Sequence, residues 1–252
     1  MLDEFFTPEP FMIGHEGFEL FGAAHLLWLA AAACAIATLS HAYCWLSPSV
    51  SNCSSPAHRA KRSLLLAIAA IPLCMAITRV CIHVSVGVTH PNWWPLHVCN
   101  LCELLAFVYA IKPNRVMGNI LFGVGLPTSI LALLFPSWSY CPPLCWASIC
   151  GFCEHALVAA CVVCLLRSHE LEPRLHDIWQ PLAVLCVYVV VMYPLNYALG
   201  TNFAFLKNPP YGSPLVPLAG TLGHPGYLVP LLVFVAVIVV ALFLWSEYSR
   251  KR

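Results

Sequence analysis

The sequence predicts an all-α polytopic membrane protein, a bundle of about seven transmembrane helices. Hydrophobic residues make up 60% of the 252 residues and charged residues only 9%, and the mean hydropathy is +0.80. Soluble domains contain about 25% charged residues, so this composition excludes an ordinary water-soluble fold. The apolar residues also form runs of about 20, the length that an α-helix needs to cross a bilayer.

The apolar runs define seven expected helices, which together form a single transmembrane domain over residues 1–252. They lie near residues 21–45, 63–88, 96–111, 116–135, 144–166, 178–199 and 226–246. The segment before the first run contains several acidic residues and neither Lys nor Arg. A cleaved signal peptide has the opposite charge pattern, so we expect the first helix to remain in the chain.

The Lys and Arg residues are distributed unevenly among the predicted loops. One side of the bundle holds Arg59, Lys61, Arg62, Lys112, Arg115, Arg167, Arg174, Arg250, Lys251 and Arg252. The loops of the other side contain only Lys207. Cytoplasmic loops are enriched in Lys and Arg, so we expect an odd number of spans, with the N-terminus outside and the C-terminus in the cytoplasm.

The net charge of +1 gives no reason to expect binding to nucleic acid. We expect membrane lipids as partners and the cell membrane, specifically a bacterial cytoplasmic membrane, as the location. No metal or cofactor is expected, because most of the fourteen cysteines lie within the apolar runs, where free Cys behaves as a small hydrophobic residue. Three C-x-x-C spacings leave a metal site open as a minor alternative.

Polar and ionisable residues within the predicted helices form one layer, between the midplane and the outer surface of the membrane. Such residues are costly in lipid and are functional hypotheses by default. The second helix carries Arg79 and His83, the third His97, Cys99, Asn100 and Glu103, the fifth Glu154 and His155, and the sixth ends at Asn196 with Asn202 just outside. We expect these side chains to line a shared polar cavity that opens outward.

A structural interpretation of the same residues is also open. Arg79 would then pair with Glu103 or Glu154, and the His and Asn side chains would form hydrogen bonds that hold the helices together. For His83 alone, and for His25 in the first helix, this structural interpretation is favoured. For His97, Glu154 and His155 we favour a functional role.

Several strings spread over the chain resemble the YwaF-like integral membrane proteins of bacteria. They are Phe18-Glu19-Leu20-Phe21-Gly22-Ala23-Ala24-His25, Trp94-Pro95-Leu96-His97-Val98-Cys99-Asn100-Leu101-Cys102, Leu131-Ala132-Leu133-Leu134-Phe135-Pro136, His155, and Asn196-Tyr197-Ala198-Leu199-Gly200-Thr201-Asn202-Phe203-Ala204-Phe205-Leu206 with Pro209-Pro210. That family is similar to eukaryotic multipass lipid acyltransferases and, more distantly, to membrane hydrolases of fatty-acid esters, which pair a Cys or Thr nucleophile with a His. The resemblance implies that His155 and His97 are the corresponding histidines. Leu96 occupies the position of the nucleophilic Cys, and Cys99 is a possible substitute.

The leading hypothesis is therefore an enzyme that acts on lipid acyl esters as an acyltransferase or hydrolase. In it, His155 is the general base, Glu154 or Glu103 orients it, and Cys99 is the candidate nucleophile. His97 belongs to the same catalytic group. The expected substrate-binding residues are Arg79, Asn100, Asn196 and Asn202, with Arg79 or Asn196 near the oxyanion or the lipid phosphate.

Two alternatives remain open. The same polar residues would serve a small transporter or a ligand-binding membrane protein without catalysis. A hydrogen bond between Cys99 and His155 would favour catalysis, whereas their separation by a whole helix would favour binding. The other alternative is thiol and disulfide exchange at Cys141 and Cys145 of the outer loop, which are spaced C-P-P-L-C.

Overall fold

The described part of the protein is entirely helical. The computed structural model describes residues 5–12, 16–46, 56–210 and 213–251, and these ranges contain helices and no strand. Six helical stretches of these residues are long and apolar enough to cross a membrane: α2 (Ala23–Trp45), α3 (Pro56–Ser85), α5 to α6 (Arg115–Leu134), α7 (Trp146–Arg167), η4 with α8 (Leu175–Leu199) and α10 (Leu228–Arg250). A shorter apolar helix, α4, spans Val98–Ile111. The all-α, polytopic fold is confirmed.

Helices occur at all seven predicted positions, with two differences. Helix α3 begins at Pro56, well before residue 63, because its first turns are polar and extend the helix beyond its apolar part. There the Lys61 ammonium lies 2.5 Å from a carboxylate oxygen of Glu170 and 4.6 Å from the centre of the Tyr43 ring. The last loop contains an additional helix, α9 (Leu215–Gly226), which the apolar runs did not predict.

The fourth span is composite. It consists of α5 (Arg115–Ile120), the π-helical segment η3 (Leu121–Gly125) and α6 (Leu126–Leu134). Gly123 allows the close approach of η3 to its neighbours, because a Cβ at this position would lie 2.7 Å from Pro181 of α8 (Trp179–Leu199) and 3.2 Å from Phe243 of α10. Through η3, the last two spans therefore contact the rest of the bundle.

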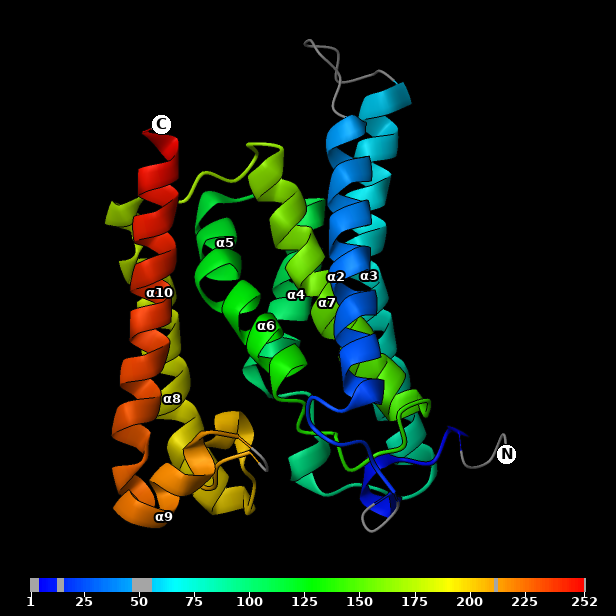
Figure 1. The fold of residues 1–252 in the computed structure, drawn as a ribbon, viewed down its shortest axis with the longest axis vertical. Coiled ribbons are helices and arrows are strands. Elements are labelled where there is room, and N and C mark those ends of the chain that lie inside the picture. The colour runs from blue at the N-terminus through cyan, green and yellow to red at the C-terminus, as the bar shows by residue number, and fades with distance from the viewer. Residues whose placement is uncertain (1–4, 13–15, 47–55, 211–212, 252) are drawn as a thin grey trace.

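Helix α7 lies at the centre of the larger group of helices, in contact with α2, α3, α4 and α6 (Figure 1). Helices α8 and α10 form a pair beside this group, next to α5 and η3 (Figure 1). The first described residues and the C-terminal end of α10 lie at opposite ends of the molecule (Figure 1). That arrangement fits an odd number of spans, while the side that faces the cytoplasm stays a prediction.

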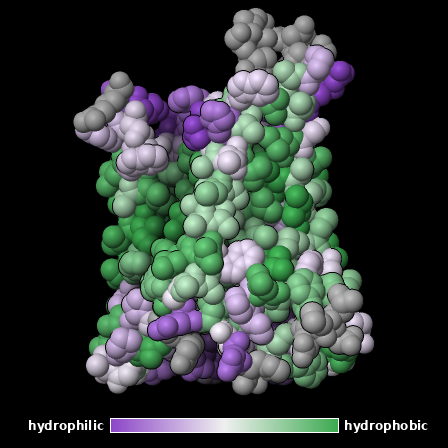
Figure 2. Space-filling view, turned by 45° about the vertical axis from the view of Figure 1, so that its right-hand side comes forward, coloured by the Kyte–Doolittle hydropathy of each residue, from purple (hydrophilic) through white to green (hydrophobic). Residues whose placement is uncertain are grey.

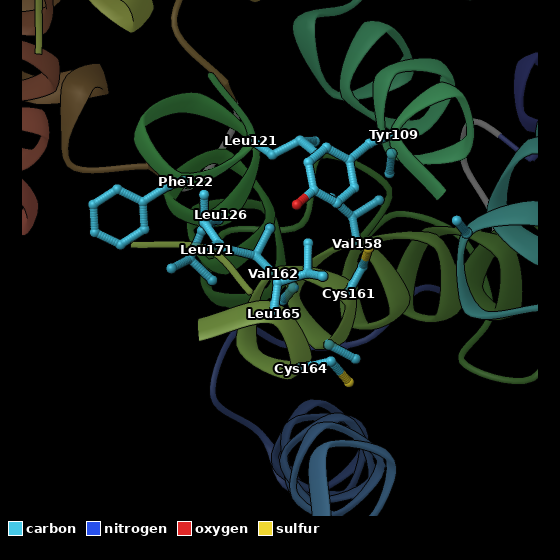
Figure 3. Packing of buried hydrophobic residues seen from close by; sticks show 14 of the residues in the cluster. Tyr109, Leu121, Phe122, Leu126, Val158, Cys161, Val162, Cys164, Leu165 and Leu171 are labelled. Carbon is cyan, nitrogen blue, oxygen red and sulfur yellow. The ribbon is translucent and has the colours of Figure 1, made fainter. Parts of the chain in front are cut away.

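The surface and the core both reflect a membrane environment. Figure 2 shows a broad apolar band around the middle of the molecule, with polar residues gathered at the two ends. Inside, α7 supplies Val158, Cys161, Val162, Cys164 and Leu165 to the main apolar core. There they pack with residues of α4, of η3 and of the loop that follows α7 (Figure 3). Cys161 and Cys164 are fully buried thiols in this core, as expected for cysteines that serve as small hydrophobic residues.

Candidate functional site

An ion pair between two helices forms the centre of the polar layer. The guanidinium of Arg79, on α3, lies 3.2 Å from Oε2 of Glu154, on α7. The Glu154 side chain is only 1% exposed, whereas that of Arg79 is 21% exposed. Of the two carboxylates considered as partners for Arg79, Glu154 therefore makes the direct contact. Its second oxygen, Oε1, is buried and has no hydrogen-bond partner among the described residues.

Helix α4 brings a second buried carboxylate to the same layer. Glu103 is 2% exposed and accepts hydrogen bonds from Nδ2 of Asn100, at 3.3 Å to each carboxylate oxygen. Both Arg79 and Glu154 lie within electrostatic range of Glu103. Cys99, on the preceding turn, is within electrostatic range of the same three charges. Three helices thus contribute residues to one group.

His155 is held in one orientation. Its Nδ1 lies 2.7 Å from the carbonyl oxygen of Gly151, one turn earlier on α7, and its ring stacks on Trp138 with 5.3 Å between the centroids. A carbonyl oxygen only accepts hydrogen bonds, so Nδ1 carries the proton and Nε2 of the neutral ring is free to act as a base. Nε2 has no hydrogen-bond partner in the described part of the chain. Gly151 makes room for this stack, because a Cβ there would overlap the indole of Trp138.

His97 reaches the same group from the start of α4. It is the N-cap residue of that helix and packs edge-on against Phe203, with 5.3 Å between the ring centroids. Arg79 and His155 both lie within electrostatic range of its ring. Hydrogen bonds between Cys99 and either imidazole are absent from the described residues. Both predicted histidines therefore lie within electrostatic range of Arg79, and the described residues contain no hydrogen-bonded pair of Cys99 with either histidine.

The N-terminal segment adds a residue that the sequence did not single out. Glu9, in the short helix η1 (Glu9–Phe11), lies 2.6 Å from Nε2 of His83 on α3. Burial raises the pKa of Glu9, but the hydrogen bond with His83 and the nearby charge of Arg79 outweigh it, so the pKa lies below its usual value. Glu9 thus joins the segment before the first span to the polar layer.

Two predicted substrate-binding residues lie at the C-terminal end of α8 and in the turn that follows it. Asn196 is fully buried, and its Oδ1 accepts hydrogen bonds from the Thr201 hydroxyl at 2.8 Å and from the Phe203 backbone at 2.7 Å. Asn202 Oδ1 likewise accepts from the backbone N–H groups of Lys207 and Asn208. No hydrogen bond joins these side-chain amides to Arg79 among the described residues, and their hydrogen bonds fix the turn that carries Phe203.

The other histidine considered, His25, is engaged in backbone contacts. It is fully buried, with Nδ1 accepting from the Phe21 backbone and Nε2 at 2.8 Å from the Leu133 carbonyl oxygen.

The cysteines of the C-x-x-C spacings do not gather with other ligands: in the described ranges, no three His, Cys, Asp or Glu residues form a group that could hold a metal ion.

Two cavities of the described residues lie away from this layer. One, of about 330 Å³, is lined by Tyr109, Arg115, Glu170 and Arg174, at the opposite end of α4 and α7. The other is a small apolar cavity between η3, α6, α8 and α10. The expected outward-opening cavity is neither of these and stays a prediction.

A family model matches residues 20–248, which include every predicted site residue and all seven spans except the last two residues of α10. The chain belongs to the TMEM164 family. It is an integral, multipass membrane protein of that family. No curated protein and no solved structure matches the chain. The match to the TMEM164 family supports the prediction that the chain belongs to a family of membrane proteins. The resemblance to YwaF-like proteins and to acyltransferases stays a prediction.

Proposed function

We propose that this member of the TMEM164 family is a membrane-embedded enzyme that acts on acyl esters of lipids, with His155 as the general base. One observation carries the proposal. The Gly151 carbonyl fixes Nδ1 of His155, Nε2 has no hydrogen-bond partner among the described residues, and the ring lies within electrostatic range of Arg79 and His97. A neutral imidazole with one nitrogen fixed and the other free is the arrangement that a general base needs.

The geometry favours a water or alcohol nucleophile over Cys99. Because no hydrogen bond joins Cys99 to an imidazole in the described residues, no histidine is in place to remove its proton. In the proposed reaction, Nε2 of His155 takes a proton from the nucleophile, whose oxygen attacks the ester carbon. Arg79 or His97 stabilises the resulting oxyanion. When the ester bond breaks, the leaving alkoxide takes the proton from His155. Water gives hydrolysis, and a lipid alcohol gives acyl transfer.

Comparison of cellular lipids tests the proposal directly. Cells that express the wild-type chain should differ in their acyl-chain distribution from cells that express His155→Ala, as measured by mass spectrometry of extracted lipids. His41→Ala is the matched control, because His41 is an exposed histidine near the far end of α2. Equal amounts of folded protein are checked by size-exclusion chromatography. A His155→Ala profile that equals the wild-type profile would refute the assignment.

A second candidate, a ligand-binding protein or transporter without catalysis, is favoured by the missing Cys99 and His155 contact and by the direct pairing of Arg79 with Glu154. Within the enzyme proposal, Cys99→Ser distinguishes a water or alcohol nucleophile from a Cys99 nucleophile. The variant should keep its activity if the nucleophile is water or an alcohol. Wild-type cells whose lipids equal those of cells without the protein would favour the binding function.

A further inference from the structure

The loop between α6 and α7 holds two cysteines in contact with each other. Cys141 is fully buried and Cys145 is 4% exposed, and the Cys141 thiol forms a hydrogen bond with the Cys145 sulfur. They form a small buried cluster with Met12 and Ala147. None of these four residues belongs to the polar layer around Arg79, so the thiol pair is separate from the proposed catalytic group.

The loop holds the two sulfur atoms in a fixed arrangement. Pro142 and Pro143 lie between the cysteines, and proline rings fix the φ angle. The carbonyl oxygen of Pro142 accepts a hydrogen bond from the Ser148 hydroxyl at 2.8 Å, and that of Pro143 accepts one from Nε1 of Trp28 at 2.9 Å. This stiff, anchored loop keeps the thiols together, which lowers the entropic cost of joining them.

The surroundings of Cys145 favour the thiolate. Cys145 is the N-cap residue of α7, where the backbone N–H groups of Ala147 and Ser148 interact with its sulfur, and its Sγ lies 3.6 Å from the Ser148 hydroxyl. The Cys141 hydrogen bond and the backbone N–H groups of Ala147 and Ser148 outweigh burial and lower the pKa of Cys145 to about 6. The pKa of Cys141 is raised, chiefly because its thiol donates to Cys145. A helix N-terminus is one of the settings that lower a thiol pKa, and the thiolate is the reactive form.

We propose that Cys141 and Cys145 form a redox-active dithiol site whose substrate is a small disulfide. The Cys145 thiolate attacks one sulfur of the disulfide, which forms a mixed disulfide and releases one thiolate. Cys141 then loses its proton and attacks the Cys145 sulfur, which forms the Cys141–Cys145 bond and releases the second thiol. The two protein thiols are oxidised, and one external disulfide is reduced to two thiols.

The test uses the purified full-length chain in detergent, with oxidised glutathione as the disulfide. Because this oxidant is polar, it should not enter the apolar core that contains Cys161 and Cys164. After incubation, remaining thiols are alkylated, and chymotrypsin releases the segment 141–146 by cleavage after Tyr140 and Trp146. Mass spectrometry should show this segment converted from the doubly alkylated form to the internal disulfide, while Cys161 and Cys164 stay alkylated.

Single variants identify the roles of the two thiols. In Cys141→Ser, the Cys145 adduct with glutathione should accumulate, because no second thiol displaces it. In Cys145→Ser, reaction at Cys141 should be slower than the wild-type reaction by about tenfold or more, since thiolate is the attacking species. Ser148→Ala should slow the wild-type reaction more modestly, and Met12→Ala should accelerate it by uncovering the sulfur atoms.

Two results would overturn the proposal. One is a segment 141–146 that remains doubly alkylated at every concentration of oxidised glutathione, both in the wild type and in Met12→Ala. The other is a glutathione adduct that forms equally fast on Cys141 and Cys145 in the single variants. A merely structural thiol pair would give the first result. Neither outcome depends on the lipid chemistry of His155, so each proposal can fail alone.

Discussion

Helices α7 and α10 are alike in length and both are apolar enough to cross a membrane, but they differ in where their side chains point. The most apolar window of α7 is 72% buried inside the protein, whereas that of α10 is 11% buried, although α10 is the more hydrophobic helix. The ionisable residues Glu154 and His155 lie in the middle of α7, and those of α10 lie at its last turns. In a lipid environment, the less hydrophobic helix is therefore the one that the protein surrounds, because its polar groups need partners.

The largest expected effect follows from leaving one charge of α7 unpaired. Arg79→Met removes the partner of Glu154, which is almost completely buried, so it should lower the free energy of unfolding by about 3–5 kcal/mol. The matched change on the lipid-facing helix, Val237→Met, should have little effect because Val237 is 58% exposed. Thermal unfolding in detergent measures both. Equal stability of the two variants would break the contrast between the helices.

A comparison of two leucines measures the same contrast without charges. Leu165→Ala, in the core on α7, should cost about 2–5 kcal/mol because it leaves a cavity. Leu232→Ala, on α10, should cost less than about 0.5 kcal/mol, because Leu232 is 43% exposed and its neighbour is mainly lipid. Thermal unfolding of both variants under one condition gives the difference. A loss of stability in Leu232→Ala as large as that in Leu165→Ala would contradict the contrast, because it would show that α10 packs against protein at this position.

Two glycines sharpen the comparison at the site itself. Gly151→Ala should destabilise by about 1–3 kcal/mol, because the new methyl group displaces Trp138 from its contact with Gly151 and His155. Gly220→Ala, on α9, should be neutral or slightly stabilising, since nothing lies within 4 Å of the added Cβ. Unfolding curves followed by tryptophan fluorescence report stability, and the difference between the Gly151→Ala and wild-type spectra reports the change around Trp138, one of eight tryptophans. An unchanged Gly151→Ala spectrum and stability would contradict the stacked arrangement.

The smallest expected effect concerns the N-terminal segment and pH. Because the pKa of Glu9 is lowered by folding, its contribution is present above the ordinary carboxyl pKa and is lost as the pH falls through the lowered value. We expect the wild type to lose about 1 kcal/mol more than Glu9→Gln between pH of about 6 and about 3. The difference between the two proteins isolates Glu9 from Glu103 and Glu154. Parallel losses would show that the Glu9 and His83 contact adds no stability.

The helix positions could be predicted from the sequence, because run length and hydropathy decide which segments cross a bilayer. The start of α3 could not, since its first two turns are polar and are stabilised by a distant contact of Lys61 with Glu170. Helix α9 was missed because its twelve residues include three glycines and two prolines, a composition typical of loops.

The sequence could predict which residues of the candidate site lie in one layer, but it could not predict which of them contact each other. Depth along each helix placed Arg79, Glu103 and His155 in one layer, whereas the choice of Glu154 over Glu103 as the direct partner depends on helix rotation. Glu9 was missed because an acidic residue before the first span is usually a solvated one. The position of Gly151 one turn before His155 was the available sign that another ring packs there.

The shared polar layer is tested most directly by a double-mutant cycle on Arg79 and Glu154. Unfolding free energies are measured for the wild type, Arg79→Met, Glu154→Leu and the double variant. Because each single variant leaves a buried charge without its partner, we predict that the double variant is more stable than the sum of the single losses by about 2 kcal/mol or more. Losses that add within about 0.5 kcal/mol would contradict a direct contact between α3 and α7 at this pair.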